Sequence, residues 1–291
     1  MTQHSTHIPE VRPIASVCIL CGTPTGNHFL YPGILKCSSC GFVFADIQMS
    51  PAELQKLYAR NYFFGSEYLN YLEDKSTLQK NFGGRLRTLR KYSSGGNLIE
   101  IGCAYGFFLE LAQRHWKAEG CDISEPACTE ARRQGLSVTC GDFLELPLPE
   151  RQYNVVAMWD TIEHLSRPDL YVEKASKILK SGGVLCVTTG DIGSAMAMWR
   201  KSRWRLIHPP THLYYFDRAS MERLMVKNGL DIVHFEHCGY SRSVEQIFYS
   251  LFVLNRETAV RRKLYDFFKP MLGFSLYVNL FDIMFVIARK K

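Results

Sequence analysis

The sequence lacks both an apolar leader and an uninterrupted apolar run long enough to cross a bilayer. Met1 to Glu10 is polar and has no apolar core of a secretory signal. The longest apolar stretch, residues 271–288, contains Asn279 and Asp282. An aspartate near the centre of a membrane helix costs roughly 2.5–3.5 kcal/mol. We therefore expect a buried strand over residues 281–288 and a cytoplasmic protein.

A strong excess of one charge is also absent. The 35 basic and 28 acidic residues leave a net charge of +7, which permits an anionic substrate but does not indicate nucleic acid. Hydrophobic residues make up 46% and charged residues 22% of the 291 residues, a balance typical of globular proteins. The sequence has no internal repeat, and its length indicates one large domain, with or without a small one.

Four of the ten cysteines follow a metal-binding pattern. Cys18 and Cys21 form one Cys-x2-Cys pair, Cys37 and Cys40 form another, and fifteen residues separate the pairs. Two such turns bring four thiolates to the corners of a tetrahedron, which is the geometry that structural zinc prefers. The alternative of two disulfides needs an oxidising compartment, for which the N-terminus gives no signal. We expect the other six cysteines to be free thiols, mostly buried.

The pattern of the chain divides it into four parts. We expect a flexible lead at residues 1–16, a zinc ribbon at 17–45, a helical lid or linker at 46–96 and an α/β domain at 97–291. In the last part, short apolar runs alternate with helical stretches, which indicates a doubly wound, mostly parallel sheet. A helical insertion at about residues 239–275 precedes the last strand.

A glycine-containing turn follows the first strand of this α/β domain. The run Glu100-Ile101-Gly102-Cys103-Ala104-Tyr105-Gly106 ends a strand and opens a helix, so that a ligand can approach the backbone closely. Alone, this pattern fits a dinucleotide site or a plain tight turn. A dinucleotide fingerprint needs glycine at positions 104 and 107, where the sequence has alanine and phenylalanine.

Acidic residues follow the next two strands. Asp122 ends the second strand, where a carboxylate can accept hydrogen bonds from two ribose hydroxyls. Asp142 and Phe143 follow the third strand, where a carboxylate beside an aromatic ring can bind an adenine. Each residue alone is typical of a turn, but together and in this order they indicate an adenosine-binding edge.

These motifs resemble those of class I S-adenosylmethionine (SAM)-dependent methyltransferases over about residues 97–231, and less clearly to residue 291. The resemblance implies a seven-stranded Rossmann-like sheet and SAM as the cofactor. It also implies a cofactor site made of Glu100, Gly102, Ala104, Tyr105, Gly106, Asp122, Ile123, Asp142, Phe143 and Trp159. Ala104 departs from the family, which commonly has a glycine there, and we expect it to fit with ordinary backbone dihedrals.

Acidic and imidazole side chains follow the fourth and fifth strands. The run from Asp160 to Glu163 and His164 resembles the region after strand four of ubiquinone-type O-methyltransferases, and His212 follows the fifth strand. Because strand ends line the ligand crevice of such sheets, we assign Asp160, His164 and His212 to catalysis, with a histidine as general base. The alternatives are structural histidines, or a divalent ion bound by Asp160, Glu163, His164 and His212.

Two further segments bear on the acceptor. Residues 199–205 mix basic residues with two tryptophans, which predicts either a grip on phosphates and bases or a basic loop that closes the pocket. Residues 243–272 carry apolar helical faces flanked by basic residues. They predict a pocket cap, a dimer surface or a pair of helices in peripheral contact with a membrane.

The sequence therefore predicts a methyltransferase that moves a methyl group from SAM to an oxygen, nitrogen or carbon atom of a small molecule or sugar-type metabolite. One alternative is an RNA-modifying enzyme whose ribbon holds the nucleic acid, and salt-dependent RNA retention would support it. Another is a non-catalytic binding module, which a failure to bind SAM would support. The sequence does not set the oligomeric state.

Overall fold

The computed structural model describes residues 17–24, 28–47, 75–249 and 274–291, together with Glu53, Tyr265, Phe267, Phe268 and Leu272. The lead at residues 1–16 lies outside this set. So do most of the helical lid expected upstream of residue 75 and the middle of the insertion expected at about 239–275.

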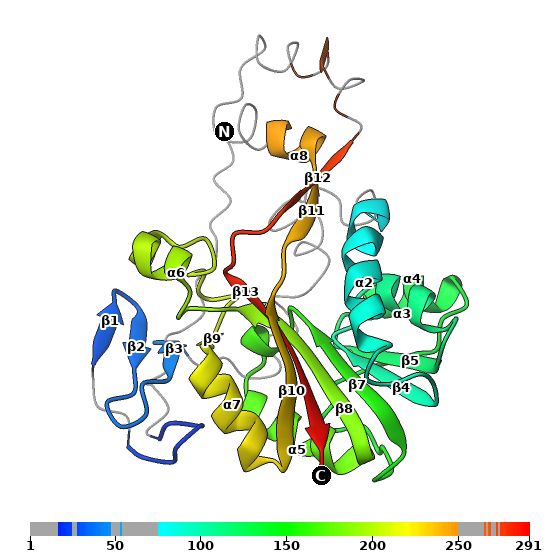
Figure 1. The fold of residues 1–291 in the computed structure, drawn as a ribbon, viewed down its shortest axis with the longest axis horizontal. Helices are drawn as coiled ribbons and strands as arrows, with labels where there is room; N and C mark the ends of the chain where they lie inside the picture. The colour runs from blue at the N-terminus through cyan, green and yellow to red at the C-terminus, as the bar shows by residue number, and fades with distance from the viewer. Residues whose placement is uncertain are drawn as a thin grey trace.

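A seven-stranded sheet forms the centre of the molecule (Figure 1). Its strands lie in the order β10-β13-β8-β7-β4-β5-β6. The five strands from β8 to β6 pair in parallel, and β13 lies antiparallel between β8 and β10, so the sheet is mostly parallel as expected. The bounds are β4 (Asn97–Ile101), β5 (Lys117–Asp122), β6 (Val138–Cys140), β7 (Tyr153–Trp159), β8 (Leu179–Gly190), β10 (Leu230–His237) and β13 (Ile283–Lys290).

Helices cover both faces of this sheet because its strands are apolar on both sides. Successive strand residues point to opposite faces, so that Leu98 and Val155 belong to one core and Ile99 and Val156 to the other. The first core includes residues of α2 (Lys75–Leu89), α3 (Phe107–Ala112) and α4 (Glu125–Arg133). The second includes residues of α5 (Pro168–Ile178) and α7 (Arg218–Lys227).

The cysteine-bearing segment forms a second, antiparallel sheet in the order β1-β2-β3-β9. Its first three strands come from the ribbon and the fourth from the α/β domain: β1 (Phe29–Tyr31), β2 (Ile34–Lys36), β3 (Val43–Ala45) and β9 (Tyr214–Tyr215). The Phe42 ring packs against Phe216, with centroids 5.3 Å apart. In Figure 1 the ribbon lies on the left, beside β9 and α7. The ribbon and the α/β domain therefore share one hydrophobic core.

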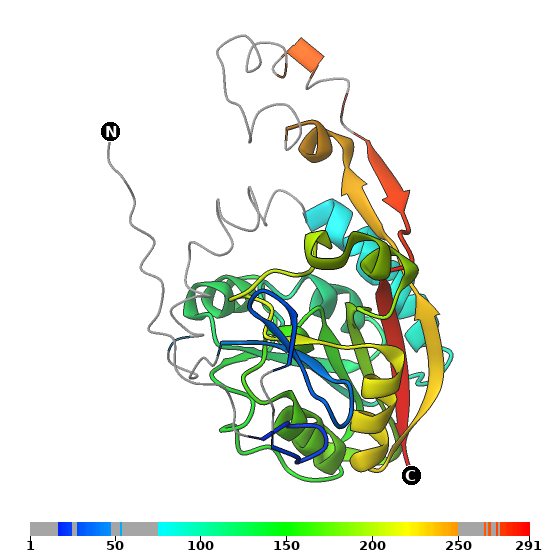
Figure 2. The same cartoon turned by 90° about the vertical axis from the view of Figure 1, so that its left-hand side faces the viewer.

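A narrow strand pair rises from the carboxyl edge of the central sheet (Figures 1 and 2). β11 (Tyr240–Ser243) follows β10 and pairs antiparallel with β12 (Ser275–Val278), and α8 (Val244–Tyr249) continues from β11. The Asn81 side chain on α2 accepts a hydrogen bond from the Ser241 N–H (2.6 Å) and donates one to the Ser241 carbonyl (3.2 Å). Within the expected helical insertion, the described residues form the strand β11 and the short helix α8, and Tyr265, Phe267 and Phe268 are also helical, whereas β12 begins only at its last residue.

The apolar stretch near the C-terminus is a strand, as expected, although β13 begins two residues later than predicted. Asp282, just before it, is 1% exposed. Its carboxylate accepts a hydrogen bond from Trp204 Nε1 and forms an ion pair with Arg205, both at 2.9 Å. Among the described residues, no helix is long and apolar enough to cross a membrane.

Candidate active site and cysteine cluster

The turn between β4 and α3 uses left-handed backbone at three positions. Gly102, Ala104 and Gly106 have φ values of 73°, 46° and 73°. A Cβ on Gly102 would lie 2.6 Å from Thr161 Cγ2, so the ends of β4 and β7 can approach only because glycine is there. The expectation of ordinary dihedrals at Ala104 is wrong, because this residue turns its N–H toward Asp122 Oδ2, 2.8 Å away.

Asp122 closes this turn from the end of β5. Its two carboxylate oxygens accept hydrogen bonds from the N–H groups of Ala104 and Ser124, each at 2.8 Å. Burial raises the pKa of Asp122, and these N–H groups lower it in part. Ile123, the next residue, packs against Leu213. The predicted cofactor site therefore adjoins the loop that carries His212.

Glu100 is buried near the same turn, with 2% of its surface exposed. Burial and the charge of Asp122 hold the pKa of Glu100 well above its usual range, and Arg85 lowers it in part. Within the described part of the chain, Glu100 Oε2 and Ser124 Oγ are buried without a hydrogen-bonding partner. A ligand rich in hydroxyl and amino groups would satisfy such atoms, and a nucleoside is one.

The other residues predicted to contact the cofactor contribute mainly to the cores. Asp142 accepts a hydrogen bond from the Tyr171 hydroxyl at 2.5 Å. Phe143 is 1% exposed, and its ring packs against Tyr171 with centroids 5.6 Å apart. Tyr105 and Trp159 are 3% and 6% exposed. These three aromatic rings therefore support the site from within the hydrophobic core, and the prediction that Phe143 and Trp159 contact the cofactor gains no support from their burial.

Asp160, at the end of β7, belongs to a network of hydrogen bonds and an ion pair. Its carboxylate accepts hydrogen bonds from Arg85 Nη2 (3.1 Å), the Tyr240 hydroxyl (2.5 Å) and Thr188 Oγ1 (3.0 Å). The Arg85 guanidinium is nearly buried and lies over three aromatic rings, 5.0–5.6 Å from their centroids. Burial raises the pKa of Asp160, but Arg85 and these hydrogen bonds lower it by more, so that the pKa lies below its usual value. The Asp160 carboxylate, held by these partners, is better suited to positioning neighbouring side chains than to transferring a proton.

His164 and His212 lie edge to face, with ring centroids 4.7 Å apart. His164 Nδ1 donates to the Thr211 carbonyl (2.7 Å), and His212 Nδ1 donates to the Leu206 carbonyl (2.9 Å). Because a carbonyl oxygen only accepts, Nδ1 carries the proton in each ring and Nε2 is the basic nitrogen. Burial lowers the pKa of each histidine to about 4, so both imidazoles are neutral at neutral pH.

Glu163 completes this histidine cluster. Burial raises the pKa of Glu163 to about 7, and His212 lowers it in part. Oε2 of Glu163 is buried without a hydrogen-bonding partner among the described residues. One ligand atom from each of Glu163, His164 and His212 lies within 4.8 Å of the others. Three of the four residues predicted to bind a divalent ion therefore converge, whereas the Asp160 carboxylate bonds to Arg85 and Tyr240.

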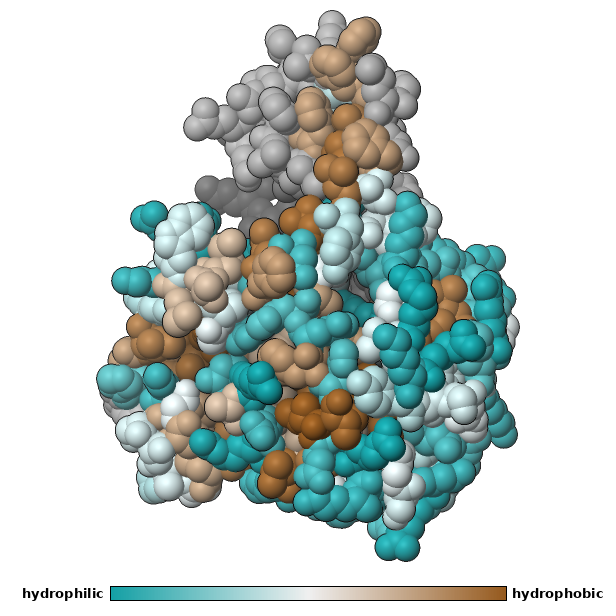
Figure 3. Space-filling view, viewed as in Figure 1, coloured by the Kyte–Doolittle hydropathy of each residue, from teal (hydrophilic) through white to brown (hydrophobic). Residues whose placement is uncertain are grey.

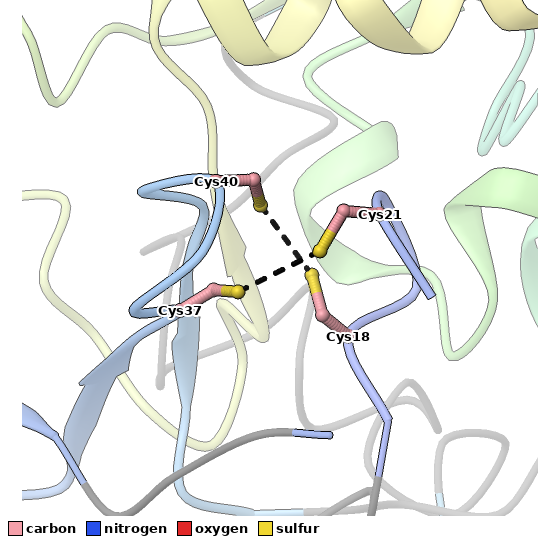
Figure 4. A group of neighbouring side chains, drawn as sticks. All are labelled: Cys18, Cys21, Cys37 and Cys40. Carbon is pink, nitrogen blue, oxygen red and sulfur yellow. Dashed lines mark hydrogen bonds between the residues drawn. The ribbon is translucent and has the colours of Figure 1, made fainter. Parts of the chain in front are cut away.

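The four patterned cysteines converge as well (Figure 4). The Sγ atoms of Cys18 and Cys40, and those of Cys21 and Cys37, are 3.7 Å apart. Four sulfurs around a tetrahedral zinc ion, with Zn–S bonds of about 2.3 Å, would be about 3.8 Å apart. Burial raises the pKa of Cys37, but backbone N–H groups outweigh this effect and lower the pKa to about 6. A thiolate is therefore available at neutral pH. The cluster therefore has the geometry of a closed four-thiolate zinc site.

Backbone hydrogen bonds join the ribbon to the histidine cluster. The Ala45 N–H donates to the Leu213 carbonyl, and the Leu213 N–H donates to the Glu163 carbonyl, each at 2.8 Å. The Tyr215 hydroxyl donates to the His212 carbonyl at 3.0 Å. A single residue, Leu213, thus stands between strand β3 of the ribbon and the backbone of Glu163.

The basic segment at residues 199–205 does not present one continuous surface. It spans the end of α6 (Ala195–Arg200) and the short 3-10 helix η3 (Lys201–Arg203). Trp199 is 73% exposed, but Trp204 is 2% exposed, and Arg205 pairs with Asp282. Trp204 is the one buried residue of this segment, and the residues on either side of it are exposed.

The fold and this site agree with the comparison with known families. A family model described as a methyltransferase domain matches residues 73–235, which is more than half of the chain. The chain belongs to this family. It is a class I SAM-dependent methyltransferase.

Individual relatives are distant. A ubiquinone biosynthesis O-methyltransferase from Agrobacterium fabrum is 27% identical over 186 residues, 59% of this chain and 72% of that protein. A probable SAM-dependent methyltransferase from Mycolicibacterium smegmatis is 32% identical over 99 residues, 33% of this chain and 38% of that protein. The solved structure of a SAM-dependent methyltransferase from Archaeoglobus fulgidus has a TM-score of 0.52 at 19% identity, covers 76% of this chain and 99% of that one, and shows the likeness of fold.

Sequence reasoning missed two residues of the site, Arg85 and Tyr240. Arg85 lies in a helix that the sequence marks only as basic, and Tyr240 lies in the segment read as a helical insertion. Neither carries a local motif. The available signal was the aspartate at the end of the apolar strand β7, because a carboxylate beside a hydrophobic core favours a cationic partner that the neighbouring sequence does not supply.

Proposed function

We propose that this methyltransferase transfers the methyl group of SAM to an oxygen atom of a small-molecule or sugar-type acceptor. The observation that carries the proposal is the pair of adjacent histidines, His164 and His212, each with Nδ1 bonded to a backbone carbonyl, on the same sheet edge as Asp122. The printed name of the Agrobacterium relative, an O-methyltransferase, supports an oxygen acceptor. Burial of Trp204 leaves one of the two indoles of residues 199–205 unavailable for stacking on bases, which argues against base recognition by this segment.

The residues at the ends of β4 and β5 fit the cofactor. Asp122 would accept hydrogen bonds from the ribose hydroxyls, and the unsatisfied oxygen of Glu100 lies near the same turn. Gly102 and Gly106 allow the tight turn at this edge, because a Cβ at either position would meet the side chain of Thr161 or Leu136. When bound there, SAM supplies an activated methyl group on a positively charged sulfur.

The histidine cluster would remove the proton from the acceptor. As the methyl group is transferred to the acceptor oxygen, Nε2 of His212 or His164 would accept the hydroxyl proton. Nδ1 stays protonated and bonded to a backbone carbonyl, so the ring is held in the reactive orientation. The growing imidazolium charge would be stabilised by the carboxylate of Glu163, which lies in the same cluster.

A second chemistry for the same cluster is a divalent ion bound by Glu163, His164 and His212. One carboxylate and two imidazoles form a set that suits several divalent metals, and their ligand atoms lie within 4.8 Å. Such an ion would lower the pKa of a bound acceptor hydroxyl. Full activity after exhaustive chelation favours the histidine as base, and activity restored by one added divalent metal favours the ion.

The cysteine cluster is proposed to hold a structural zinc ion. The four cysteines would supply all four ligands of the ion, which leaves no coordination position for a substrate. The ribbon would then serve the reaction by supporting the backbone of Leu213 and Glu163.

The test is methyl transfer from isotopically labelled SAM to a panel of hydroxylated small molecules and sugars. We expect His212→Gln to lower kcat by about 10²–10⁴-fold, as for loss of a general base, while SAM affinity measured by calorimetry is unchanged. His115→Gln, outside the site at the end of α3, is the matched control and should keep its kcat.

Three results would redirect the proposal. Unchanged kcat in His212→Gln and in the matching His164 variant would show that neither histidine is the general base. Salt-sensitive retention and labelling of RNA, with no labelled small molecule, would favour the RNA-modifying alternative. Failure to bind SAM would leave a non-catalytic binding module.

A further inference from the structure

The strand pair β11–β12 carries an unusual apolar strand. Leu276, Tyr277 and Val278 are successive residues of β12, so that their side chains point alternately to opposite faces, yet they are 49%, 64% and 41% exposed. The residues that flank this strand continue the pattern: Phe274, Leu280 and Phe281 are 53%, 41% and 64% exposed. Six large apolar side chains are therefore exposed within eight residues.

This apolar strand protrudes from the body of the protein. Figure 2 shows β11 and β12 extending beyond the carboxyl edge of the central sheet, and Figure 3 shows apolar side chains over the same region. Monomeric proteins seldom expose large contiguous apolar patches unless they bind a partner or a membrane there. Both faces of the strand are exposed, whereas a flat protein partner would cover one. An interfacial lipid layer can surround both.

The surroundings of the strand pair are basic. Helix α2, fixed to β11 through Asn81, has four basic residues and no acidic residue. Two of these, Lys80 and Arg87, are exposed and line a groove of about 700 Å³ between α2 and the strand pair, together with one acidic residue, Glu236. Arg242 is exposed on β11 itself. In sequence, the segment that joins α8 to β12 adds five basic residues against two acidic ones.

This charge distinguishes an anionic membrane from a second copy of the chain. In a twofold dimer the same patch faces itself, so these basic groups would approach their own symmetry mates and repel them. Anionic headgroups would instead attract each basic residue near the membrane surface. Aromatic side chains such as Phe274, Tyr277 and Phe281 suit the zone between headgroups and acyl chains.

We propose that β12 and the turn after it, residues 274–281, dock this enzyme on an anionic membrane surface. The strand pair begins at the active site, because the Tyr240 hydroxyl at its base donates to Asp160 at the end of β7. Docking through residues 274–281 therefore brings the site edge of the sheet close to the lipid. The inference concerns attachment to the membrane and does not depend on the acceptor proposed above.

The test is co-sedimentation of the full chain with vesicles of phosphatidylcholine alone, or of phosphatidylcholine and phosphatidylglycerol in equal parts. We expect binding to the anionic vesicles that weakens with salt. The double variant Leu276→Ser/Phe281→Ser should lower the partition coefficient by roughly tenfold or more, because two large apolar side chains no longer enter the interface. The matched control is Phe29→Ser/Val226→Ser, which removes apolar side chains of similar exposure, 54% and 53%, on β1 and α7.

Each outcome decides the inference. Loss of binding in the first double variant and its retention in the control supports docking through β12. No binding by the wild type, or equal loss in both double variants, overturns it. A dimer in sedimentation velocity that Leu276→Ser/Phe281→Ser dissociates, without vesicle binding, overturns it in favour of a second copy. SAM affinity is measured for every variant, so that failure of the methyltransferase site is recognised separately.

Discussion

Two residues at the site adopt a backbone conformation that usually belongs to glycine. Ala104 has a φ of 46° and Asp160 a φ of 51°, and left-handed backbone costs an L-residue roughly 1–2 kcal/mol. In both cases the conformation aims an N–H at an acceptor: Ala104 donates to Asp122, and Asp160 donates to the Thr188 carbonyl. Strain at these strand ends thus holds the predicted cofactor acid and the ion-pair network in place.

A substitution at Gly102 tests how closely the ends of β4 and β7 pack. Gly102→Ala should lower the free energy of unfolding by about 2 kcal/mol more than Gly135→Ala, and should abolish SAM binding. Both glycines have a positive φ, 73° and 81°, but only a Cβ at position 102 would meet Thr161. Urea unfolding and calorimetry with SAM measure the two effects. Equal losses in the two variants would mean that the contact with Thr161 contributes nothing.

The lowered pKa of His212 predicts that the stability of the protein depends on pH. Burial lowers this pKa from 6.5 to about 4, so between these pH values the folded state binds fewer protons than the unfolded state. Stability should therefore be fully present above about pH 6.5 and fall toward pH 4, by about 3 kcal/mol for this residue. Glu163, whose pKa is raised to about 7, opposes part of this loss.

The measurement is the unfolding free energy in urea at neutral pH and at about pH 4.5. His212→Gln removes the titrating imidazole, and we expect its stability to fall less than that of the wild type across this range. A variant with the same or a steeper decline would show that His212 is not held neutral by burial.

At the scale of elements, the site depends on segments that are distant in sequence. Helix α2 supplies Arg85, β7 supplies Asp160, and β11 supplies Tyr240, and the three side chains meet in one network. The alternating strands and helices of the α/β domain were predictable, because each follows from local periodicity. This network was not, because local sequence does not say which helix packs over a given strand end.

The same limit explains the other differences. The turns of the ribbon could be predicted from the local spacing of its cysteines. The addition of β9 to the ribbon sheet could not, because it depends on where the α/β domain places Tyr214 and Tyr215. Ala104 was misjudged because its dihedral follows from its hydrogen bond to Asp122, eighteen residues later. Strand β11 lies inside the segment predicted as a helical insertion, and it is recognised as a strand only through its pairing with β12.

Breaking the Arg85–Asp160 pair should cost much more than breaking a more exposed pair on the same helix. Arg85→Met leaves the Asp160 carboxylate without its cation in a site where Arg85 is 5% exposed, so we expect a loss of about 2–3 kcal/mol, discounted for the partial exposure of Asp160. Lys75→Met breaks the Lys75–Glu110 pair, in which both side chains are about one-third exposed (36% and 35%), and should cost less than about 1 kcal/mol.

Urea unfolding of both variants and of Arg85→Met/Asp160→Asn checks this prediction. If the cost arises from an uncompensated carboxylate, the double variant should recover part of the stability lost in Arg85→Met. Similar losses in Arg85→Met and Lys75→Met would mean that the buried pair is no stronger than the surface one.

At the scale of the whole molecule, the ribbon and the α/β domain form one cooperative body. One hydrophobic core contains Phe42 and Phe44 of the ribbon together with Phe216 and Met221 of the α/β domain. Backbone hydrogen bonds continue from β3 through Leu213 to Glu163. Damage to the metal site should therefore reach the histidine cluster.

Loss of the proposed zinc ion should destabilise the entire protein. Cys37→Ser is expected to abolish stoichiometric zinc and to lower a single, shared Tm by several degrees, because the ribbon and the α/β domain share a core. Cys140→Ala, which lies outside the cluster, should keep its zinc. Metal analysis and scanning calorimetry provide the measurements. Two separate transitions in the wild type would contradict the shared core.

The pairing of β3 with β9 also orders the events of biosynthesis. β3 ends at residue 45 and its partner begins at residue 214, so most of the α/β domain must be made before the fourth strand of the ribbon sheet exists. Until then the nascent ribbon has an open strand edge and an uncovered Phe42, which are hazards for association with other chains. Early capture of zinc would give this exposed intermediate a fixed shape while it waits on the ribosome.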